Sequence, residues 1–244
     1  MYKNDEVYGK SIEFYDIAAL SQISNKENVL KKFIEMAVKH QGIILDIGAG
    51  TGKVTVKVAK LASNKEVIAL EPSSYMRTAF MTRMMEHKEL ERQITIFPLG
   101  VSEYTFDEKV SGILCMGVLG HLSVQERQEL WKKLENTLEA GVPVLIELLD
   151  QRFLSASEGS RISVAIQGRL RYETYITSIK QLNQTQWEWI LTYRIFDGKR
   201  LVKQIKSPMS WTYESVEEVL GELTKVHFRG VKLSDTLLLA TKTK

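Results

Sequence analysis

Little in this sequence suggests a disulfide-stabilised or strongly charged protein. Its 244 residues include one cysteine, four prolines and four histidines. A single cysteine excludes a disulfide framework or a cysteine metal cluster within the chain, and Cys115 lies in an apolar run, where we expect a core residue. The formal net charge is only +3, which gives no argument for nucleic-acid binding. We therefore expect no metal site and no nucleic-acid partner.

Long apolar stretches are also missing. No stretch reaches the ~18 apolar residues that a membrane-spanning helix needs, and the first residues, Met-Tyr-Lys-Asn-Asp-Glu, lack the apolar segment of a signal peptide. We therefore expect no membrane association and a location in the cytoplasm. Hydrophobic residues make up 44% and charged residues 26% of the chain, as is usual for globular proteins, and the length allows one large α/β domain with additions.

Strand-like and helical patterns alternate through the first 150 residues. Short apolar runs typical of buried strands lie at 43–47, 67–70, 94–97, 110–116 and 142–149. Helical spacing separates them, and the last of these helices begins with a capping box at Ser123 and Glu126. This alternation predicts a doubly wound, mostly parallel sheet. A helix over 215–223 and a closing pair of strands at 225–233 and 235–241 would complete seven strands.

Residues 151–211 have a different pattern. The stretches 163–177, 185–196 and 200–205 are rich in aromatic and β-branched residues and often alternate, which predicts an antiparallel insert after the fifth strand. Asp197-Gly198 is a hairpin signal. Trp187, Trp189 and Tyr193 would share one face and could wall a ligand pocket, pack on the core sheet, or pack on a second subunit in a homodimer.

These patterns divide the chain into three parts. Residues 1–150 would form an N-terminal helical cap and a ligand-binding α/β core, residues 151–211 the antiparallel insert, and residues 212–244 the last helix and strands of the core.

The most informative stretch is Leu45-Asp46-Ile47-Gly48-Ala49-Gly50-Thr51-Gly52. Glycines at the end of a buried strand bring bare backbone close to a ligand. A dinucleotide fingerprint places its third glycine one position later, at Lys53, and a phosphate-binding loop would have Ser or Thr at Val54. Glu71 ends the next strand, where a carboxylate can accept hydrogen bonds from both hydroxyls of a ribose. A ribose without a phosphate clamp suggests S-adenosylmethionine.

On these residues the sequence resembles the class I S-adenosylmethionine-dependent methyltransferases. The stretch 45–52 matches their first motif, Leu70-Glu71-Pro72-Ser73 with Met76 matches the second, and Val118-Leu119-Gly120-His121-Leu122 matches the segment after strand four. The resemblance covers residues 24–149 and the last two strands, and implies a Rossmann-like methyltransferase fold. One departure follows strand three, where the family often has Gly-Asp and this chain has Leu99-Gly100-Val101-Ser102-Glu103.

The resemblance also implies residues that bind S-adenosylmethionine and its product S-adenosylhomocysteine. Gly48 and Gly50 would lie against the methionine part, Asp46 would orient the loop, and Glu71 would hold the ribose. Adenine would lie against Met76, unless that residue is plain core, or against Pro72. Ser102, Glu103 or the local backbone would replace the family's acid near the adenine amino group. Other expected contacts come from Ala49, Val101, Met116 and Tyr8.

Methyl transfer is an in-line displacement that mainly needs an aligned nucleophile and the exclusion of water. A hydroxyl acceptor benefits from a base, and His121 is the candidate, although a loop histidine can also shape a pocket or cap the following helix. Tyr15 is a second catalytic candidate. Tyr8 and Tyr15 could close over the cofactor or simply pack.

Similar inserts occur in small-molecule members of the family, notably amino-sugar N-methyltransferases, where they wall the acceptor pocket. We therefore expect an enzyme that methylates a nitrogen or oxygen of a small molecule. One alternative acceptor is protein or RNA, against which the weak charge and the absence of an Asn/Asp-Pro-Pro-Tyr segment argue. The other alternative is an inactive S-adenosylmethionine-binding module, against which the complete first motif and Glu71 argue.

Overall fold

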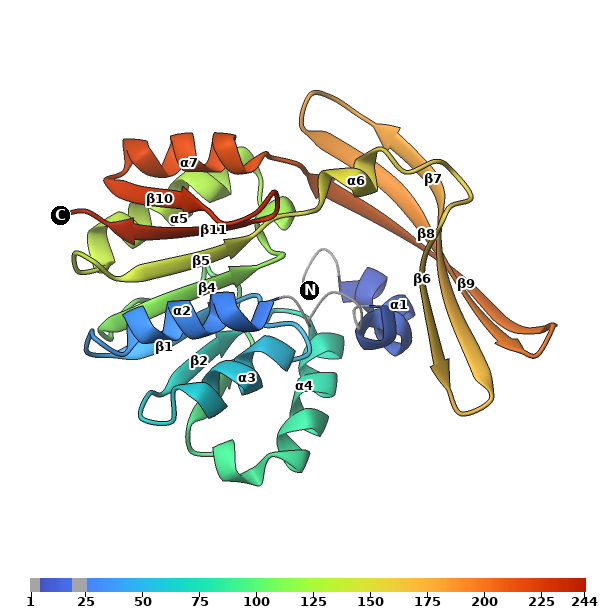
Figure 1. Ribbon diagram of the computed structural model, residues 1–244, viewed down its shortest axis with the longest axis horizontal. Helices are drawn as coiled ribbons and strands as arrows, with labels where there is room; N and C mark the ends of the chain where they lie inside the picture. Colours follow the sequence, from blue (N-terminus) through green and yellow to red (C-terminus); the bar gives the residue numbers. More distant parts are fainter. Residues whose placement is uncertain (1–4, 19–25) are drawn as a thin grey trace. The chain divides into compact units, whose positions relative to one another are not determined.

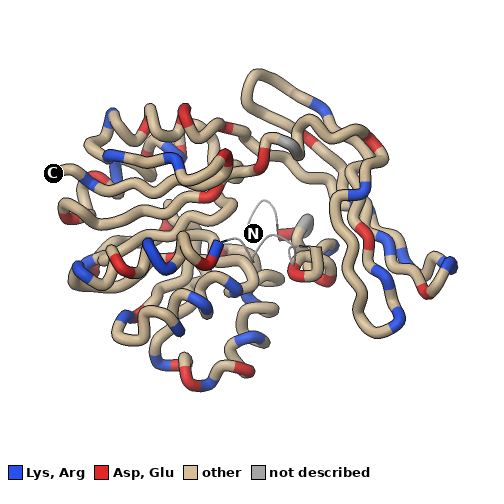
Figure 2. Tube along the Cα trace, in the orientation of Figure 1, with Lys and Arg blue, Asp and Glu red and all other residues tan. Residues whose placement is uncertain are grey.

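The computed structural model describes residues 5–18 and 26–244, which divide into two compact units (Figure 1). The core unit comprises Asn28–Asp150 and Glu214–Lys244, and the insert unit joins the N-terminal residues up to Glu27 to Gln151–Tyr213. Among the described residues, no helix is long and apolar enough to cross a membrane. Acidic and basic residues are interspersed along the helices of the core unit (Figure 2).

A seven-stranded sheet in the order β10-β11-β5-β4-β1-β2-β3 forms the core unit. Strands β1 to β5 are parallel, whereas β11 is antiparallel to β5 and β10 to β11. This is the predicted doubly wound fold. The order reverses between β1 and β4, so the crevice at their carboxyl ends is the expected ligand position in such sheets. The strands are β1 Ile43–Ile47, β2 Val67–Leu70, β3 Ile94–Phe97, β4 Val110–Met116, β5 Pro143–Glu147, β10 Phe228–Lys232 and β11 Leu237–Lys242.

Helices cover both faces of this sheet because its strands are apolar on both sides. In β1, Ile44 packs with the apolar residues of α2 and α3, while Leu45 packs with those of α5 and α7 on the opposite face. Phe80 of α4 joins the α2–α3 side. The helices are α2 Glu27–Ala37, α3 Lys53–Leu61, α4 Ser74–Glu86, α5 Val124–Thr137 and α7 Val216–Lys225, with short 3₁₀ turns η2 Lys88–Leu90 and η3 Leu119–His121.

The insert unit contains a separate antiparallel sheet in the order β6-β7-β8-β9. The predicted hairpin at Asp197-Gly198 is confirmed, because Asp197 of β8 pairs with Arg200 of β9. The stretch 163–177 is two strands rather than one, since the chain reverses at Gly168 (φ 59°) and Gln167 pairs with Leu170. The strands are β6 Arg161–Gln167, β7 Leu170–Gln181, β8 Gln186–Asp197 and β9 Arg200–Thr212.

Two helices belong to the insert unit, α1 Asp5–Ala18 and the short α6 Gln151–Leu154. Phe14 of α1 stacks on Tyr193 of β8 with ring centroids 4.7 Å apart and meets Tyr172 edge-on at 5.9 Å. Lys203 of β9 forms an ion pair with Glu13 at 2.6 Å. Helix α1 therefore supplies apolar cover for the antiparallel sheet, whereas the division drawn from the sequence kept residues 1–150 together.

Candidate functional site

The glycine loop between β1 and α3 adopts a backbone that only glycine takes easily. Gly48, Gly50 and Gly52 have φ values of 66°, 59° and 76°, in the left-handed region. A Cβ atom on Gly52 would lie 2.2 Å from the Phe80 ring, and one on Gly48 would lie 2.4 Å from Val118 Cγ2. The loop is thus packed between α4 and the segment that follows β4, which leaves no space for side chains at these two glycines.

Glu71 is held directly against this loop. Its carboxylate is only 5% exposed, and Gly50 N–H donates to Oε2 at 2.7 Å while Ser73 N–H donates to Oε1 at 2.8 Å. In a phosphate-binding loop, backbone N–H groups of this kind face the phosphate. Here a carboxylate takes the Gly50 N–H, so a phosphate would meet a negative charge. The arrangement fits a phosphate-free nucleoside such as S-adenosylmethionine and disfavours a dinucleotide.

Asp46 lies beneath the same loop. It is buried near the end of β1, and Thr55 Oγ1 of α3 donates to its Oδ2 at 2.6 Å. The pKa of Asp46 is raised to about 7, mainly by burial and in smaller part by the nearby Glu71 carboxylate, while the Thr55 hydrogen bond acts in the opposite direction. The side chain therefore links β1 to the first turn of α3. Its expected role in orienting the loop toward a cofactor stays a prediction.

The residues expected around adenine have different environments. Met76 is buried in the first turn of α4, with its N–H donating to Ser73 Oγ at 3.4 Å. Val101 packs into the apolar core on the α5 side. Glu103 turns back and accepts the Gly100 N–H at 2.9 Å, while Ser102 is exposed. Which of these residues contacts adenine stays a prediction.

Ala49, Pro72 and Met116 are half-buried around the glycine loop and the ends of β2 and β4. Ala49 and Met116 pack against the apolar cluster on the α2–α3 side of the sheet.

His121 ends the 3₁₀ turn η3, beyond the carboxyl end of β4. The backbone N–H of His121 donates to the Val118 carbonyl oxygen at 2.8 Å. Val118 is also the residue that a Cβ atom on Gly48 would meet. Burial lowers the pKa of His121 to about 4. The imidazole is therefore neutral near pH 7, able to accept a hydrogen bond but a weak proton acceptor.

Tyr8 and Tyr15 lie on α1, in the insert unit. Tyr8 is buried and Tyr15 is exposed, and their rings meet edge-on with centroids 6.3 Å apart. Their closure over the cofactor and a catalytic role for Tyr15 stay predictions.

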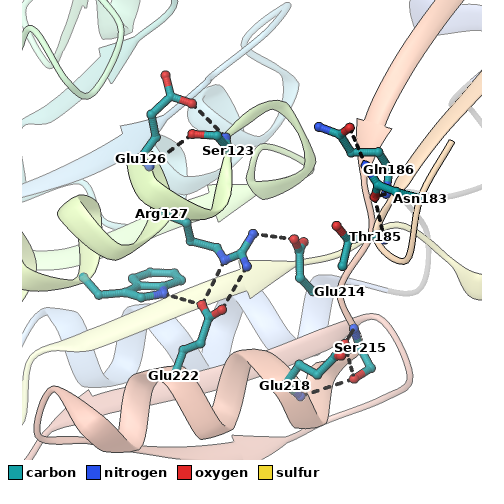
Figure 3. Close-up of polar contacts among 11 residues, drawn as sticks. Ser123, Glu126, Arg127, Asn183, Thr185, Gln186, Glu214, Ser215, Glu218 and Glu222 are labelled. Carbon is teal, nitrogen blue, oxygen red and sulfur yellow. Dashed lines mark hydrogen bonds and ion pairs between the residues drawn. The ribbon is translucent and has the colours of Figure 1, made fainter.

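Sequence reasoning missed a buried ion cluster in the core unit (Figure 3). The Arg127 guanidinium, on α5, donates to Glu222 of α7 through Nε at 2.9 Å and through Nη2 at 2.8 Å, and it also pairs with Glu214. Trp131 Nε1 donates to Glu222 Oε2 at 2.8 Å. Glu214 is the first residue after the insert unit. The signal that could have revealed the cluster is the position of Arg127 on the apolar stripe of α5, with Leu130 and Leu134.

Burial raises the pKa of Glu214 to about 7, against the opposing effect of Arg127. The pKa of Glu222 is lowered instead, because its hydrogen bonds to Arg127 and Trp131 outweigh its burial, which acts in the opposite direction. One arginine therefore joins two carboxylates of different acidity where the chain re-enters the core.

Residues 44–141 match a family model described as a methyltransferase domain, and no curated protein matches the chain. Several solved structures share the fold. An S-adenosylmethionine-dependent methyltransferase from Clostridium acetobutylicum is 16% identical, with a TM-score of 0.68 over 97% of this chain and 99% of the other. CalS10, an amino pentose methyltransferase from Micromonospora echinaspora, is 14% identical, with a TM-score of 0.72 over 94% and 96%.

The CcbJ methyltransferase from Streptomyces caelestis is 12% identical, with a TM-score of 0.74 over the full length of both chains. These likenesses establish the fold, and the family match covers the segment that contains Asp46, the glycine loop, Glu71 and His121. Residues 44–141 thus match a methyltransferase domain, and the chain shares the methyltransferase fold that its sequence predicted.

Proposed function

We propose that this enzyme transfers a methyl group to an amine nitrogen of a small molecule. The choice of nitrogen is supported by the sugar N-methyltransferase KedS8 and the amino pentose methyltransferase CalS10, which share the fold, and is consistent with the pKa of His121, which burial lowers to about 4. A general base works best when its pKa lies near the operating pH, so this histidine is poorly suited to deprotonate a hydroxyl. An amine needs only to arrive neutral, and His121 can then orient it by accepting an N–H hydrogen bond.

The cofactor would be held mainly by the glycine loop and Glu71. Gly48 and Gly50 would present backbone to its methionine part, and Glu71, fixed by the Gly50 and Ser73 N–H groups, would accept the ribose hydroxyls. When bound, S-adenosylmethionine supplies an electrophilic methyl group on a sulfonium. The residues of the chain then need to align the acceptor nitrogen and keep water away.

A small acceptor is supported by the antiparallel insert and by the structural relatives. CalS10 is an amino pentose methyltransferase. KedS8 from a Streptoalloteichus species is a sugar N-methyltransferase, 12% identical to this chain with a TM-score of 0.70 over 94% of this chain and 93% of the other. We therefore infer an amine carried on a small, polar ring as the acceptor class.

The proposal is tested in two steps. Calorimetry should detect binding of S-adenosylmethionine and S-adenosylhomocysteine, and mass spectrometry should detect methyl transfer to members of a panel of small ring amines. Binding without transfer to any amine or alcohol of the panel would favour an inactive binding module. Transfer only to alcohols would refute the choice of nitrogen.

The role of His121 is tested by His121→Asn, which keeps a hydrogen-bonding side chain without a titrating group. For an amine acceptor, we expect this variant to keep kcat within about tenfold of wild type and to keep the same pH profile, because general-base catalysis is worth about 10²–10⁴-fold. A loss in that larger range, together with a changed pH profile, would instead identify His121 as the base.

A further inference from the structure

Two buried polar atoms in the insert unit have no hydrogen-bond partner among the described residues. They are Trp189 Nε1, on a side chain that is 3% exposed, and Ser207 Oγ, on a residue with no exposed surface. A buried indole N–H or hydroxyl without a partner is costly, and such groups in native proteins usually meet an ordered water or a ligand. The pair therefore calls for an explanation.

Both atoms belong to one face of the antiparallel sheet. Trp189 of β8 lies opposite Met209 of β9, and Leu191, the next residue of β8 on this face, lies opposite Ser207. Because side chains alternate along a strand, Trp189 and Ser207 occupy adjacent rows on the same side. Two unpaired groups in neighbouring rows form one polar spot on this face.

Aromatic rings surround the Trp189 end of this face. The centroid of Trp189 is 6.2 Å from that of Trp211 and 5.6 Å from that of Phe153. At the other end, Phe14 stacks on Tyr193, and the Tyr193 hydroxyl is hydrogen-bonded to the Ser11 side chain. At the Tyr193 end of the face, α1 covers the sheet and the tyrosine hydroxyl has a partner. At the Trp189 end, aromatic rings lie beside the two polar atoms that have no partner among the described residues.

We propose that Trp189 Nε1 and Ser207 Oγ hydrogen-bond an oxygen of the methyl acceptor, whose ring lies against Trp189, Trp211 and Phe153. This inference rests on the proposed small-molecule methyl transfer and adds that the acceptor carries a hydroxyl or ether oxygen. Apolar walls with a few placed polar groups are the usual composition of small-ligand sites. Phe153, whose ring centroid is 5.6 Å from that of Trp189, belongs to the four-residue helix α6.

Indole N–H resonances of 15N-labelled protein report this hydrogen bond directly. The chain has four tryptophans, and their resonances are assigned from single Trp→Phe variants. D-glucosamine and cyclohexylamine are the probes, added to protein saturated with S-adenosylhomocysteine, because both are six-membered ring amines and only the first has oxygens. We expect glucosamine to shift the Trp189 resonance, a smaller shift in Ser207→Ala, and little effect of cyclohexylamine.

Kinetics supply the second measurement. Trp189→Phe removes the N–H and keeps a ring, so KM for glucosamine should rise about tenfold with little change in kcat, as for one lost hydrogen bond. Tyr175→Phe, which removes a hydrogen-bonding group from the opposite face of the same sheet, is the matched control and should leave KM unchanged. An unmoved Trp189 resonance at the highest glucosamine concentration, or equal KM values in both variants, would overturn the site and leave water as the partner of the two atoms.

The two proposals fail differently. If glucosamine shifts Trp189 and no amine is methylated, the binding site stands and the proposed reaction fails. If amines are methylated and the Trp189 and Tyr175 variants behave alike, the reaction stands and this site fails.

Discussion

The core unit and the insert unit treat their buried polar groups differently. In the core unit, Arg127 bonds two carboxylates, the Glu71 carboxylate accepts two backbone N–H groups, and Asp46 accepts the Thr55 hydroxyl. In the insert unit, Glu173 is fully bonded, accepting from Arg161, Arg171 and Tyr175. The opposite face of the same sheet holds Trp189 and Ser207, the two buried side chains with an unpartnered polar atom among the described residues.

The proposed function gives this difference a reason. A loop that always meets the same cofactor gains from donors and acceptors fixed before binding. A sheet that recognises a particular acceptor gains from buried donors that stay unpaired until the matching ligand arrives, because ligands lacking the partner oxygen are then rejected. The loop of the core unit is held by its own contacts, whereas under our proposal a ligand would complete the bonding of Trp189 and Ser207 in the insert unit.

The largest expected effect comes from breaking the buried ion cluster. Arg127→Met leaves Glu214 and Glu222 buried without their cation, so the free energy of unfolding should fall by about 3–5 kcal/mol. Arg161→Met in the insert unit removes an ion pair whose arginine side chain is 53% exposed and should cost at most about 1 kcal/mol. Urea denaturation measures both. Equal losses would mean that the Arg127 cluster contributes no more than a surface pair.

The second comparison is between two glycines with a left-handed φ, Gly52 in the core unit and Gly168 in the insert unit. Gly52→Ala combines a left-handed φ with a Cβ 2.2 Å from the Phe80 ring and should destabilise the protein by about 2–4 kcal/mol. Gly168→Ala in the insert unit has φ +59° and open space around the new methyl group, so only backbone strain of about 1 kcal/mol is expected. Thermal unfolding of the two variants separates strain from collision. A similar shift in both would show that Phe80 simply moves away.

Glu71 tests the cofactor site. Glu71→Gln keeps the shape of the side chain and removes its charge, and the dissociation constant of S-adenosylhomocysteine should rise about 10- to 100-fold by calorimetry, the value of one charged hydrogen bond. The matched control is Glu173→Gln, another buried carboxylate, which should leave cofactor affinity unchanged. Wild-type affinity in the Glu71 variant would refute the ribose assignment.

The smallest expected effect is a pH dependence. The folded pKa of Glu214, about 7, lies above its ordinary value of 4.5, so its stabilising contribution is complete below about pH 4.5 and is lost as the pH rises through 7. Relative to wild type, Glu214→Gln should therefore gain stability with rising pH, by less than about 1.4 kcal/mol per pH unit.

The control for this pH effect has the opposite sign. The folded pKa of Glu222 is lowered, so its contribution is present above the unfolded pKa and is lost as the pH falls through the folded pKa. Relative to wild type, Glu222→Gln should therefore lose stability as the pH rises through the range in which Glu222 ionises. Urea denaturation of wild type and the two variants between pH 4 and 8 gives the free energy of unfolding against pH for each protein. Parallel curves for the three proteins would contradict the opposite pKa shifts of Glu214 and Glu222.

The sequence by itself determined the parts that depend on neighbouring residues. Local patterns predicted the glycine loop, the β1–β5 strands, the capping box at Ser123 and the Asp197-Gly198 hairpin. Glu71 was found because parallel strands end at one edge, which brings its carboxylate to the Gly50 N–H twenty-one positions away.

Only the tertiary structure decided features that depend on distant contacts. Phe14 meets Tyr193, Arg127 meets Glu214, and Trp189 Nε1 lacks a partner among the described residues because of which side chains lie around it. The lowered pKa of His121 likewise results from burial, which no local pattern encodes. Periodicity and turn chemistry act over a few residues, whereas partners and burial are set by packing between segments far apart in the chain. The glycine loop and the position of Glu71 beside it could therefore be predicted, while the polar spot on the insert sheet could not.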